Sequence, residues 1–350
     1  MSVQERRWQP LLEQWVVISA ASSGRPWSGA TVSQSVLSQP LHDPDCYLCP
    51  GVTRASGEVN PNYAAALAFD NDFASLAGTP ALNNDTENCD VLYRKAASNG
   101  VCRVLCWSPR HNATLADLST DEMTGVTRLW QQEYIALSDC PGISNVLIFE
   151  NKGTETGVSN LHPHGQLYAT GFVTETAQRM RDSQQRYRQK HGKALLPSLI
   201  MRTEYLSELM VERTESFVTI VPFAARFAFE TWIVPTRHVP SLKQLTDAEL
   251  AELALVYQRQ ARRYDVLFQR SSPNVTLLHN APCDDHKGNA DWCFHIAMQP
   301  PLRDSDKLKY LAGFESGSGN IINPVPPEVA ASQLRQCDQA SDTQPLISCG

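Results

Sequence analysis

Short apolar stretches, bounded by polar and turn-forming residues, alternate along the chain with longer segments of helical character. The short stretches are rich in valine, leucine, isoleucine and aromatic residues, which is typical of strands. They predict strands at residues 15–19, 100–108, 145–150, 211–222, 228–235 and 274–279. Helices are predicted at residues 119–137, 175–192 and 324–335, and in the segment after residue 246.

The order of these elements repeats. Ser119 and Thr246 each begin a helix as part of a capping box, with a glutamate three residues later. His111 lies eight residues before Ser119, and His238 lies eight residues before Thr246. We infer two copies of one strand–helix–strand–strand unit. The predicted division is a first half at residues 1–172, a second half at residues 173–337, and a polar tail at residues 338–350.

Two histidines lie close together in residues 159–166, which read Ser-Asn-Leu-His-Pro-His-Gly-Gln. If this segment is extended, His162, His164 and Gln166 share one face. A neutral imidazole can attack phosphorus and leave again, and a side-chain amide can hold a phosphoryl oxygen without activating water. Gly157, upstream, would let a phosphate approach the backbone. The alternative is a pair of polar residues at a strand edge, because His-x-His alone is a weak pattern.

The ten cysteines are expected to be thiols, as in a reducing compartment. Cys46 and Cys49 form a Cys-x-x-Cys pair, whose thiolates can bind one zinc ion. Tetrahedral closure needs about two more ligands, and histidines are available downstream. A thioredoxin-like redox pair is the alternative. It is disfavoured because the pair does not begin a helix that follows a buried strand.

Two further segments suggest a nucleotide. Asn71 and Asp72 follow Phe69 and could bond ribose hydroxyls, although the same residues favour a plain turn. Arg25 could hold a phosphate, or it could be a surface arginine stacked on Trp27.

Composition narrows the partners. The chain has 350 residues, of which 42% are hydrophobic, enough for one large or two ordinary domains with a real core. Its formal charge is -7 without any basic block, which argues against a nucleic-acid surface. No apolar run approaches transmembrane length, and residues 1–10 lack a signal-like apolar region. We expect a cytoplasmic protein that binds neither nucleic acid nor membranes.

Taken together, five motifs resemble the galactose-1-phosphate uridylyltransferases of the histidine-triad superfamily, from about residue 7 to residue 335. The motifs lie at residues 43–51, 71–73, 108–111, 150–153 and 159–166. The resemblance implies an α+β fold: a duplicated histidine-triad (HIT-like) fold with one large, mostly antiparallel mixed sheet and helices packed on it. It also implies a homodimer. The implied enzyme exchanges UMP between UDP-glucose and galactose-1-phosphate through a uridylyl-histidine intermediate.

The resemblance also implies the role of individual residues. His164 would be the nucleophile, Gln166 would bond the transferred phosphoryl group, and Ser159 would hold a phosphate oxygen. The zinc ligands would be Cys46, Cys49, His111 and His162. The other residues that would contact the nucleotide sugar or the sugar 1-phosphate are Arg25, Phe69, Asn71, Asp72, Asn151, Gly157, Lys309, Phe314 and Glu315.

The chain departs from the family pattern at a second metal site. His279 and His295 match two of the family's four ligands, but Met180 and Ala297 stand at the other two positions. The substitutions argue against a second metal.

Further departures concern the sugar. Ser22 stands where the family has a basic residue, and Ile321 replaces a glutamine that contacts the hexose. Residues 313–323 look more like the ADP-glucose phosphorylase branch of the family. One alternative is therefore an ADP-sugar phosphorylase or adenylyltransferase. Another is a catalytically silent protein that binds nucleotide sugars.

Overall fold

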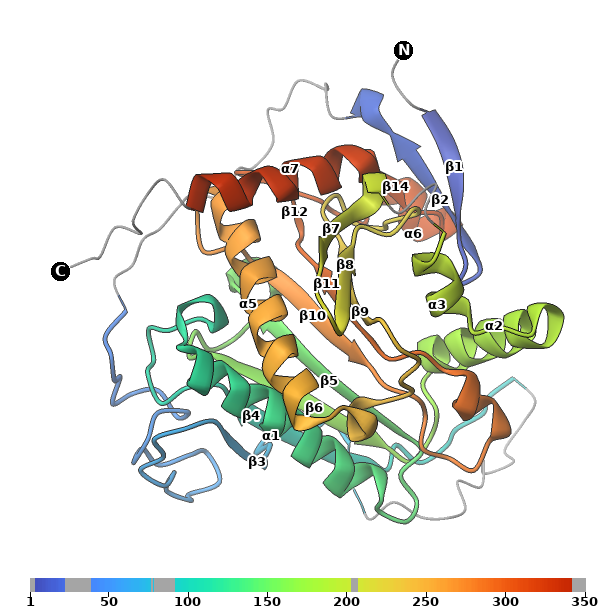
Figure 1. The fold of residues 1–350 in the computed structure, drawn as a ribbon. Coiled ribbons are helices and arrows are strands. Elements are labelled where there is room, and N and C mark those ends of the chain that lie inside the picture. The colour runs from blue at the N-terminus through green and yellow to red at the C-terminus, as the bar shows by residue number, and fades with distance from the viewer. Residues whose placement is uncertain (1–3, 23–38, 77, 79–91, 203–206, 342–350) are drawn as a thin grey trace.

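The computed structural model describes residues 4–22, 39–76, 78, 92–202 and 207–341 (Figure 1). Arg25, one of the predicted phosphate contacts, lies outside these residues. The strands are β1 (Gln4–Gln9), β2 (Gln14–Ser19), β3 (Leu67–Asp70), β4 (Gly100–Cys106), β5 (Asn145–Lys152), β6 (His164–Thr170), β7 (Met210–Arg213), β8 (Phe217–Ile220), β9 (Thr231–Pro235), β10 (Asn274–His279), β11 (His295–Gln299), β12 (Leu302–Asp304), β13 (Lys307–Leu308) and β14 (Ile322–Asn323). The α-helices are α1 (Thr120–Ser138), α2 (Glu175–His191), α3 (Leu195–Ile200), α5 (Asp247–Phe268), α6 (Gly313–Ser318) and α7 (Pro327–Ser341).

One nine-stranded sheet organises the molecule, in the order β3-β4-β6-β5-β10-β11-β9-β8-β7. All neighbouring strands in it are antiparallel. The order reads outward from the centre as β5-β6-β4-β3 on one side and β10-β11-β9-β8 on the other. The two copies therefore meet at β5 and β10, where Lys152 pairs with Asn274 and Leu147 pairs with His279. This confirms the predicted fold class.

Two long helices, one from each copy, lie side by side over one face of this sheet (Figure 1). Both capping boxes are present: Glu122 N donates to Ser119 Oγ at 3.3 Å, and Glu249 N donates to Thr246 Oγ1 at 3.2 Å. Trp130 on α1 and Tyr257 on α5 are each 1% exposed in the main core. Burying one such side chain contributes about 2–3 kcal/mol, so this layer dominates the packing energy.

The opposite face of the sheet differs between the two halves. In the second half it packs against α2 and α3 in an apolar cluster that includes Met180, Trp232 and Ala297. In the first half a loop that contains Cys46, Leu48 and Cys49 packs on Val104 and Cys106 of β4. Among the described residues, no helix is both long and apolar enough to cross a membrane.

Three local predictions need correction. Residues 211–222 are two strands, β7 and β8, because the chain turns where Thr214 N donates to Phe217 O at 2.9 Å. The last helix continues to Ser341, beyond the residue 338 at which a tail was expected, and Asp338 is paired with Arg263 at 2.8 Å. His162 precedes β6 and does not share a strand face with His164.

Candidate active site and metal centre

His164 is the first residue of β6 and opposes Cys106 of β4 across the sheet. Gly165 follows it on the helix-covered side, where Trp107 presses against the strand. A Cβ at Gly165 would lie 2.2 Å from Trp107 Cζ2 and 2.7 Å from the carbonyl oxygen of Phe149. Only glycine fits between these groups. The side chain of Trp107 therefore packs directly against β6 at Gly165, and this contact helps to position the neighbouring His164.

One hydrogen bond fixes which ring nitrogen of His164 is free. The Nδ1–H donates to the carbonyl oxygen of His162 at 2.7 Å. Burial lowers the pKa of His164, which keeps the ring neutral near pH 7. With its proton on Nδ1, a neutral imidazole has its lone pair on Nε2. His164 therefore offers Nε2 as a nucleophile.

A cavity of about 130 Å³ opens beside His164 and Gln166. Asn71 Nδ2 donates to Gln166 Oε1 at 3.5 Å, so the predicted ribose contact and the predicted phosphoryl contact lie next to each other. Ser159 is exposed at the rim of the same cavity. The residues that line it are Tyr47, Leu48, Phe69, Asn71, Asp72, Phe73, Val104, Ser159, His164 and Gln166.

A second, smaller hollow of about 50 Å³ is also lined by His164, together with residues that include Asn151, Lys152 and Gly153. The loop after β5 has two glycines with positive φ, Gly153 at 88° and Gly157 at 80°. His164 thus stands between an aromatic cavity and a loop of glycines and amides. This arrangement suits a nucleoside on one side and phosphates on the other.

The second half of the chain holds this glycine loop in place. Glu155 forms an ion pair with Arg270, and Lys152 Nζ lies 3.4 Å from Asp265 Oδ1. A Cβ at Gly153 would lie 2.8 Å from the Cβ of Pro273. The loop is therefore pressed against residues 265–273 of the other copy.

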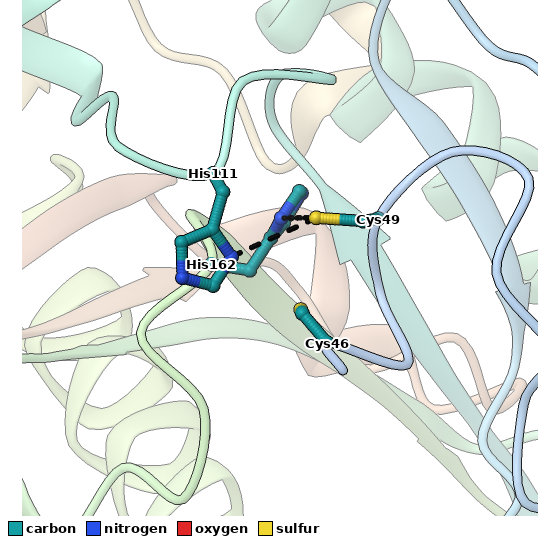
Figure 2. Close-up of side chains that lie close together, drawn as sticks. All are labelled: Cys46, Cys49, His111 and His162. Carbon is teal, nitrogen blue, oxygen red and sulfur yellow. Dashed lines mark hydrogen bonds between the residues drawn. The ribbon is translucent and has the colours of Figure 1, made fainter. Parts of the chain in front are cut away.

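The four predicted metal ligands converge on one point (Figure 2). The ligand atoms of Cys46, Cys49, His111 and His162 all lie within 4.8 Å of one another, and all four residues are buried. Cys49 Sγ lies 3.7 Å from His111 Nδ1 and 3.6 Å from His162 Nδ1. Around a tetrahedral zinc ion, with Zn–S of about 2.3 Å and Zn–N of about 2.05 Å, sulfur and nitrogen are separated by about 3.6 Å. The donor set and its spacing fit such an ion.

Outer contacts orient these ligands. His162 Nε2 lies 2.9 Å from the carbonyl oxygen of Ser108 and 3.0 Å from Tyr63 Oη, which leaves Nδ1 to face the cysteines. Buried Asn60 donates from Nδ2 to the carbonyl oxygens of Tyr47 and Cys49 at 2.9 and 3.0 Å, and so fixes the Cys-x-x-Cys turn. Residues 60–63, Asn-Pro-Asn-Tyr, are a sequence signal that could have pointed to these roles, but no role was predicted for them.

The histidines of the second half form no comparable site. The rings of His279 and His295 are stacked at 4.7 Å, and His295 also lies 5.4 Å from the ring of Trp232. His295 is fully buried; its Nδ1 donates to the carbonyl oxygen of Cys293 at 3.2 Å, and its Nε2 has no hydrogen-bond partner among the residues that the structure describes. Met180 and Ala297 belong to the apolar cluster around Trp232. Among the described residues, the one group of three or more metal-ligand side chains is the Cys46 cluster.

The predicted hexose-binding residues lie elsewhere. Lys309 and Glu315 form an ion pair at α6, and Phe314 is 57% exposed there. This segment lies beside β14, β1 and β2, at the end of the molecule away from β3 and β4 (Figure 1). The two cavities beside His164 are lined by other residues. The structure therefore does not bring these three residues to His164 within one chain.

Comparison with known proteins gives matches over nearly the whole chain. Residues 1–174 match the family model of the galactose-1-phosphate uridyl transferase N-terminal domain, and residues 180–344 match that of the C-terminal domain. The galactose-1-phosphate uridylyltransferase of Rattus norvegicus is 38% identical over 336 residues, covering 95% of this chain and 87% of that protein. The enzyme of the same name from Haemophilus influenzae is 36% identical over 332 residues, covering 94% and 93%.

Solved structures show a likeness of fold. An ADP-glucose phosphorylase from Arabidopsis thaliana, with bound ADP-glucose, has a TM-score of 0.76 at 23% identity and covers 95% of this chain and 99% of that one. A uridylyltransferase structure also has a TM-score of 0.76 at 23% identity, covering 97% and 99%. Both nucleotide-sugar enzymes thus share this arrangement of strands and helices.

Proposed function

Because the chain belongs to the galactose-1-phosphate uridyl transferase family, we propose that it moves UMP from UDP-glucose to galactose-1-phosphate through His164. The reaction has two steps. His164 Nε2 attacks the α-phosphorus of UDP-glucose, the bond to the β-phosphate oxygen breaks, and glucose-1-phosphate leaves. A phosphate oxygen of galactose-1-phosphate then attacks the same phosphorus, and the imidazole leaves with its original electron pair.

The observation that carries this proposal is the hydrogen bond from His164 Nδ1 to the carbonyl oxygen of His162, at 2.7 Å. It assigns the lone pair to Nε2 and stabilises the positive charge that develops on the ring when Nε2 bonds to phosphorus. Burial keeps the ring unprotonated before the attack. The ring also lines both cavities, so a phosphorus atom between them would be within its reach.

Neighbouring side chains would hold the phosphoryl oxygens. Gln166 lies two residues further along β6 and lines the same cavity as His164. Its amide can donate to a phosphoryl oxygen but is no base, so it would not promote hydrolysis of the intermediate. Ser159 and Asn151 flank the ring in the two cavities. With Asn71 and Asp72 on the ribose and Phe69 against the base, they complete the proposed nucleotide contacts.

We propose zinc for the Cys46, Cys49, His111 and His162 centre. Two thiolates and two imidazoles are a preferred zinc set, and four protein ligands leave no position for a catalytic water. The ion would therefore act structurally: it would tie the loop of the cysteines to His162, whose carbonyl orients His164. Among the described residues, the thiols that form no disulfide include Cys46, Cys49, Cys102, Cys106, Cys140, Cys283 and Cys293, which supports a reducing compartment such as the cytoplasm.

We further propose a homodimer in which residues 309–315 of one copy serve the site of the other. Tyr310, Leu311 and Phe314 are 54%, 49% and 57% exposed, which supports an interface at this segment. Mixing His164→Ala with Lys309→Ala, each inactive alone, should restore up to about a quarter of wild-type activity after subunit exchange, because one complete site forms per mixed dimer. Activity that stays absent after verified exchange would contradict the shared site.

The first experiment is mass spectrometry of the intact protein after mixing with UDP-glucose and quenching at alkaline pH, where a phosphohistidine is stable. The expected result is a mass increase of one UMP in the wild-type protein and none in His164→Ala. The His111→Ala variant is not a suitable control, because His111 belongs to the metal cluster. His238→Ala is suitable, since this exposed imidazole bonds only to the carbonyl oxygen of Trp292 at 2.9 Å. It should form the adduct normally.

A second candidate is transfer from an ADP-sugar, favoured by the glycine-rich pattern of residues 313–323 and by Ile321. The same measurement with ADP-glucose separates the two. An AMP adduct without a UMP adduct would show that the protein transfers adenylyl groups and not uridylyl groups. Binding of both nucleotide sugars without any adduct would point instead to a silent binding protein.

A further inference from the structure

Arg54 touches two groups that line the cavity beside His164 and Gln166. Its guanidinium lies over the ring of Phe69, 4.4 Å from the ring centroid. Its Nη1 lies 3.3 Å from Asp72 Oδ1 and also donates to the carbonyl oxygen of Asp70 at 3.2 Å. Both Phe69 and Asp72 line the cavity, whereas Arg54 does not.

These contacts are buried and directional. The side chain of Arg54 is 8% exposed and that of Asp72 is 11% exposed. The other carboxylate oxygen, Asp72 Oδ2, accepts a hydrogen bond from Ser56 N at 3.1 Å. A planar guanidinium can stack on an aromatic ring and pair with a carboxylate at the same time, which a lysine cannot do. One side chain therefore fixes the relative position of an aromatic ring and an acid.

Without Arg54 these two groups would be loosely held. Phe69 belongs to β3, a four-residue edge strand, and Asp72 lies in the turn that follows it. Each oxygen of Asp72 has two lone pairs and uses one of them inside the protein, so one remains on each for a ligand. A fixed, ionised acceptor of this kind binds hydroxyl groups strongly and is costly to leave unpaired.

Building on the proposed function, we propose that Arg54 is a positioning residue that makes the site selective for ribonucleotides. It holds Phe69 against the base and Asp72 against the ribose hydroxyls, so that a nucleotide lacking one hydroxyl leaves one acceptor position of a largely buried carboxylate unfilled. The rejection of deoxyribose then depends on an arginine that does not itself touch the nucleotide.

The test compares dissociation constants, measured by calorimetry, for UMP, 2′-deoxy-UMP and 3′-deoxy-UMP. The wild-type protein should bind UMP more tightly than at least one deoxy analogue by about tenfold or more, the value of a hydrogen bond to a charged group. Arg54→Met should bring this ratio to within about threefold of one, because Asp72 is no longer held, while weakening the binding of the deoxy analogue itself much less. Arg54→Lys, which keeps the charge but loses the planar fork, should give an intermediate ratio.

Arg103→Met is the matched control. Arg103 lies opposite Asp70 on the neighbouring strand, where it pairs with Asp70 at 3.2 Å and with Glu133, and it does not line the cavity. This variant loses two ion pairs, as an ordinary structural change would, and should keep the wild-type ratio. A ratio that changes equally in the Arg103 and Arg54 variants would overturn the proposal.

Other outcomes are equally decisive. The proposal fails if a folded Arg54→Met or Arg54→Lys protein keeps the full wild-type ratio, or if the wild-type protein does not distinguish the three nucleotides. The proposed function is tested separately, by whether a UMP adduct forms on His164. An adduct together with an unchanged ratio in the variants would remove the inference alone. A collapsed ratio without any adduct would remove the transferase reaction and leave the inference standing.

Discussion

The two halves of the sheet place histidines at related points of the same strand pattern, yet only the first half equips them for chemistry. There, His162 has a defined partner at each ring nitrogen, and His164 has one nitrogen bonded and the other free beside a cavity. In the second half, His279 and His295 are stacked beside an apolar cluster. His295 Nδ1 donates to the carbonyl oxygen of Cys293 at 3.2 Å, but its Nε2 has no partner within the described part of the chain. Burial lowers the pKa of His295 to about 4.

The difference shows that the fold alone does not make a histidine functional. An imidazole becomes a metal ligand or a nucleophile when a second polar group fixes its tautomer and when its free nitrogen faces a ligand. The first half supplies both conditions through Ser108, Tyr63 and the carbonyl of His162. In the second half, helices α2 and α3 cover the corresponding face of the sheet with apolar side chains. The second half also supports the first, for example by holding the glycine loop through Arg270 and Glu155.

The largest expected effect is a difference in turnover between variants of His164 and variants of His295, its counterpart in the second half. His164→Ala should lower turnover by roughly 10⁴-fold or more, because no covalent intermediate can form. His295→Leu should keep turnover within about threefold, since it replaces an imidazole that bonds through Nδ1 to the carbonyl oxygen of Cys293 at 3.2 Å and faces no cavity beside His164 by an apolar side chain in apolar surroundings. Steady-state kinetics with UDP-glucose and galactose-1-phosphate measures both. Comparable losses in the two variants would show that the second half takes part in the chemistry.

The second largest effect is expected in the metal content, which should depend on the cysteines of the first half and not on those of the second. We expect one zinc ion per chain by elemental analysis, lost in Cys49→Ser and retained in Cys293→Ser, a buried thiol in the cluster of the second half. Loss of the ion should lower the free energy of unfolding by about 4 kcal/mol or more, because the buried ligands lose their common partner. Two ions per chain would contradict this prediction, because they would require a metal site in the second half as well. An ion that is retained in Cys49→Ser but lost in His279→Ala would show that the metal is bound in the second half.

A smaller effect is expected from the glycine next to the nucleophile. Gly165→Ala should destabilise the protein by about 1–3 kcal/mol, since its Cβ would overlap Trp107 and displace β6. It should also slow formation of the adduct, because His164 moves with the strand. Gly125→Ala on α1 is the control, where a Cβ meets nothing within 4 Å. A helical alanine there should stabilise by about 0.5–1 kcal/mol. Urea unfolding of both variants gives the comparison, and a neutral Gly165→Ala would refute the packing argument.

The smallest expected effect is a difference between the two helix caps in how their contribution to stability depends on pH. The hydrogen bond from Arg237 lowers the pKa of Glu249 from 4.5 to about 2. A depressed pKa means that this carboxylate stabilises the fold fully above about pH 4.5, and that its contribution is lost as the pH falls toward 2. Glu249→Gln should therefore cost about 1 kcal/mol from neutral pH down to about pH 4.5, and progressively less between pH 4.5 and pH 3.

Glu122 in the first cap provides the contrast. Burial works against its ionisation, but hydrogen bonds from Ser119 and the charge of Arg110 still lower its pKa. Arg110 Nη2 lies 3.2 Å from both carboxylate oxygens, whereas Arg237 approaches Glu249 at 2.6 and 2.8 Å. The loss in Glu122→Gln should thus depend less on pH than the loss in Glu249→Gln. Urea unfolding between pH 7 and pH 3 measures both, and equal slopes would mean that the arginines do not set the difference.

The sequence by itself determined the fold class, both helix starts and the identity of the candidate site. The helix starts and the separate motifs depend on residues that are close together in the chain, whereas the fold class and the full set of metal ligands were implied by the resemblance of motifs spread over residues 7–335. A capping box spans four residues, and the Cys-x-x-Cys pair lies within one turn. Local sterics and hydrogen bonding decide such features, so they can be read without knowing the rest of the fold.

Only the tertiary structure decided how those groups are used. It placed His162 before β6 and turned it toward the cysteines, so that His162 and His164 do not share one strand face as they would in an extended segment. It brought Arg54 to Phe69 and Asp72, and it pressed residues 265–273 against the glycine loop. It also left α6, which contains Phe314 and Glu315, at the end of the molecule away from β3 and β4. These contacts join residues far apart in the chain, and the packing of whole strands and helices fixes their geometry, so no local pattern encodes it.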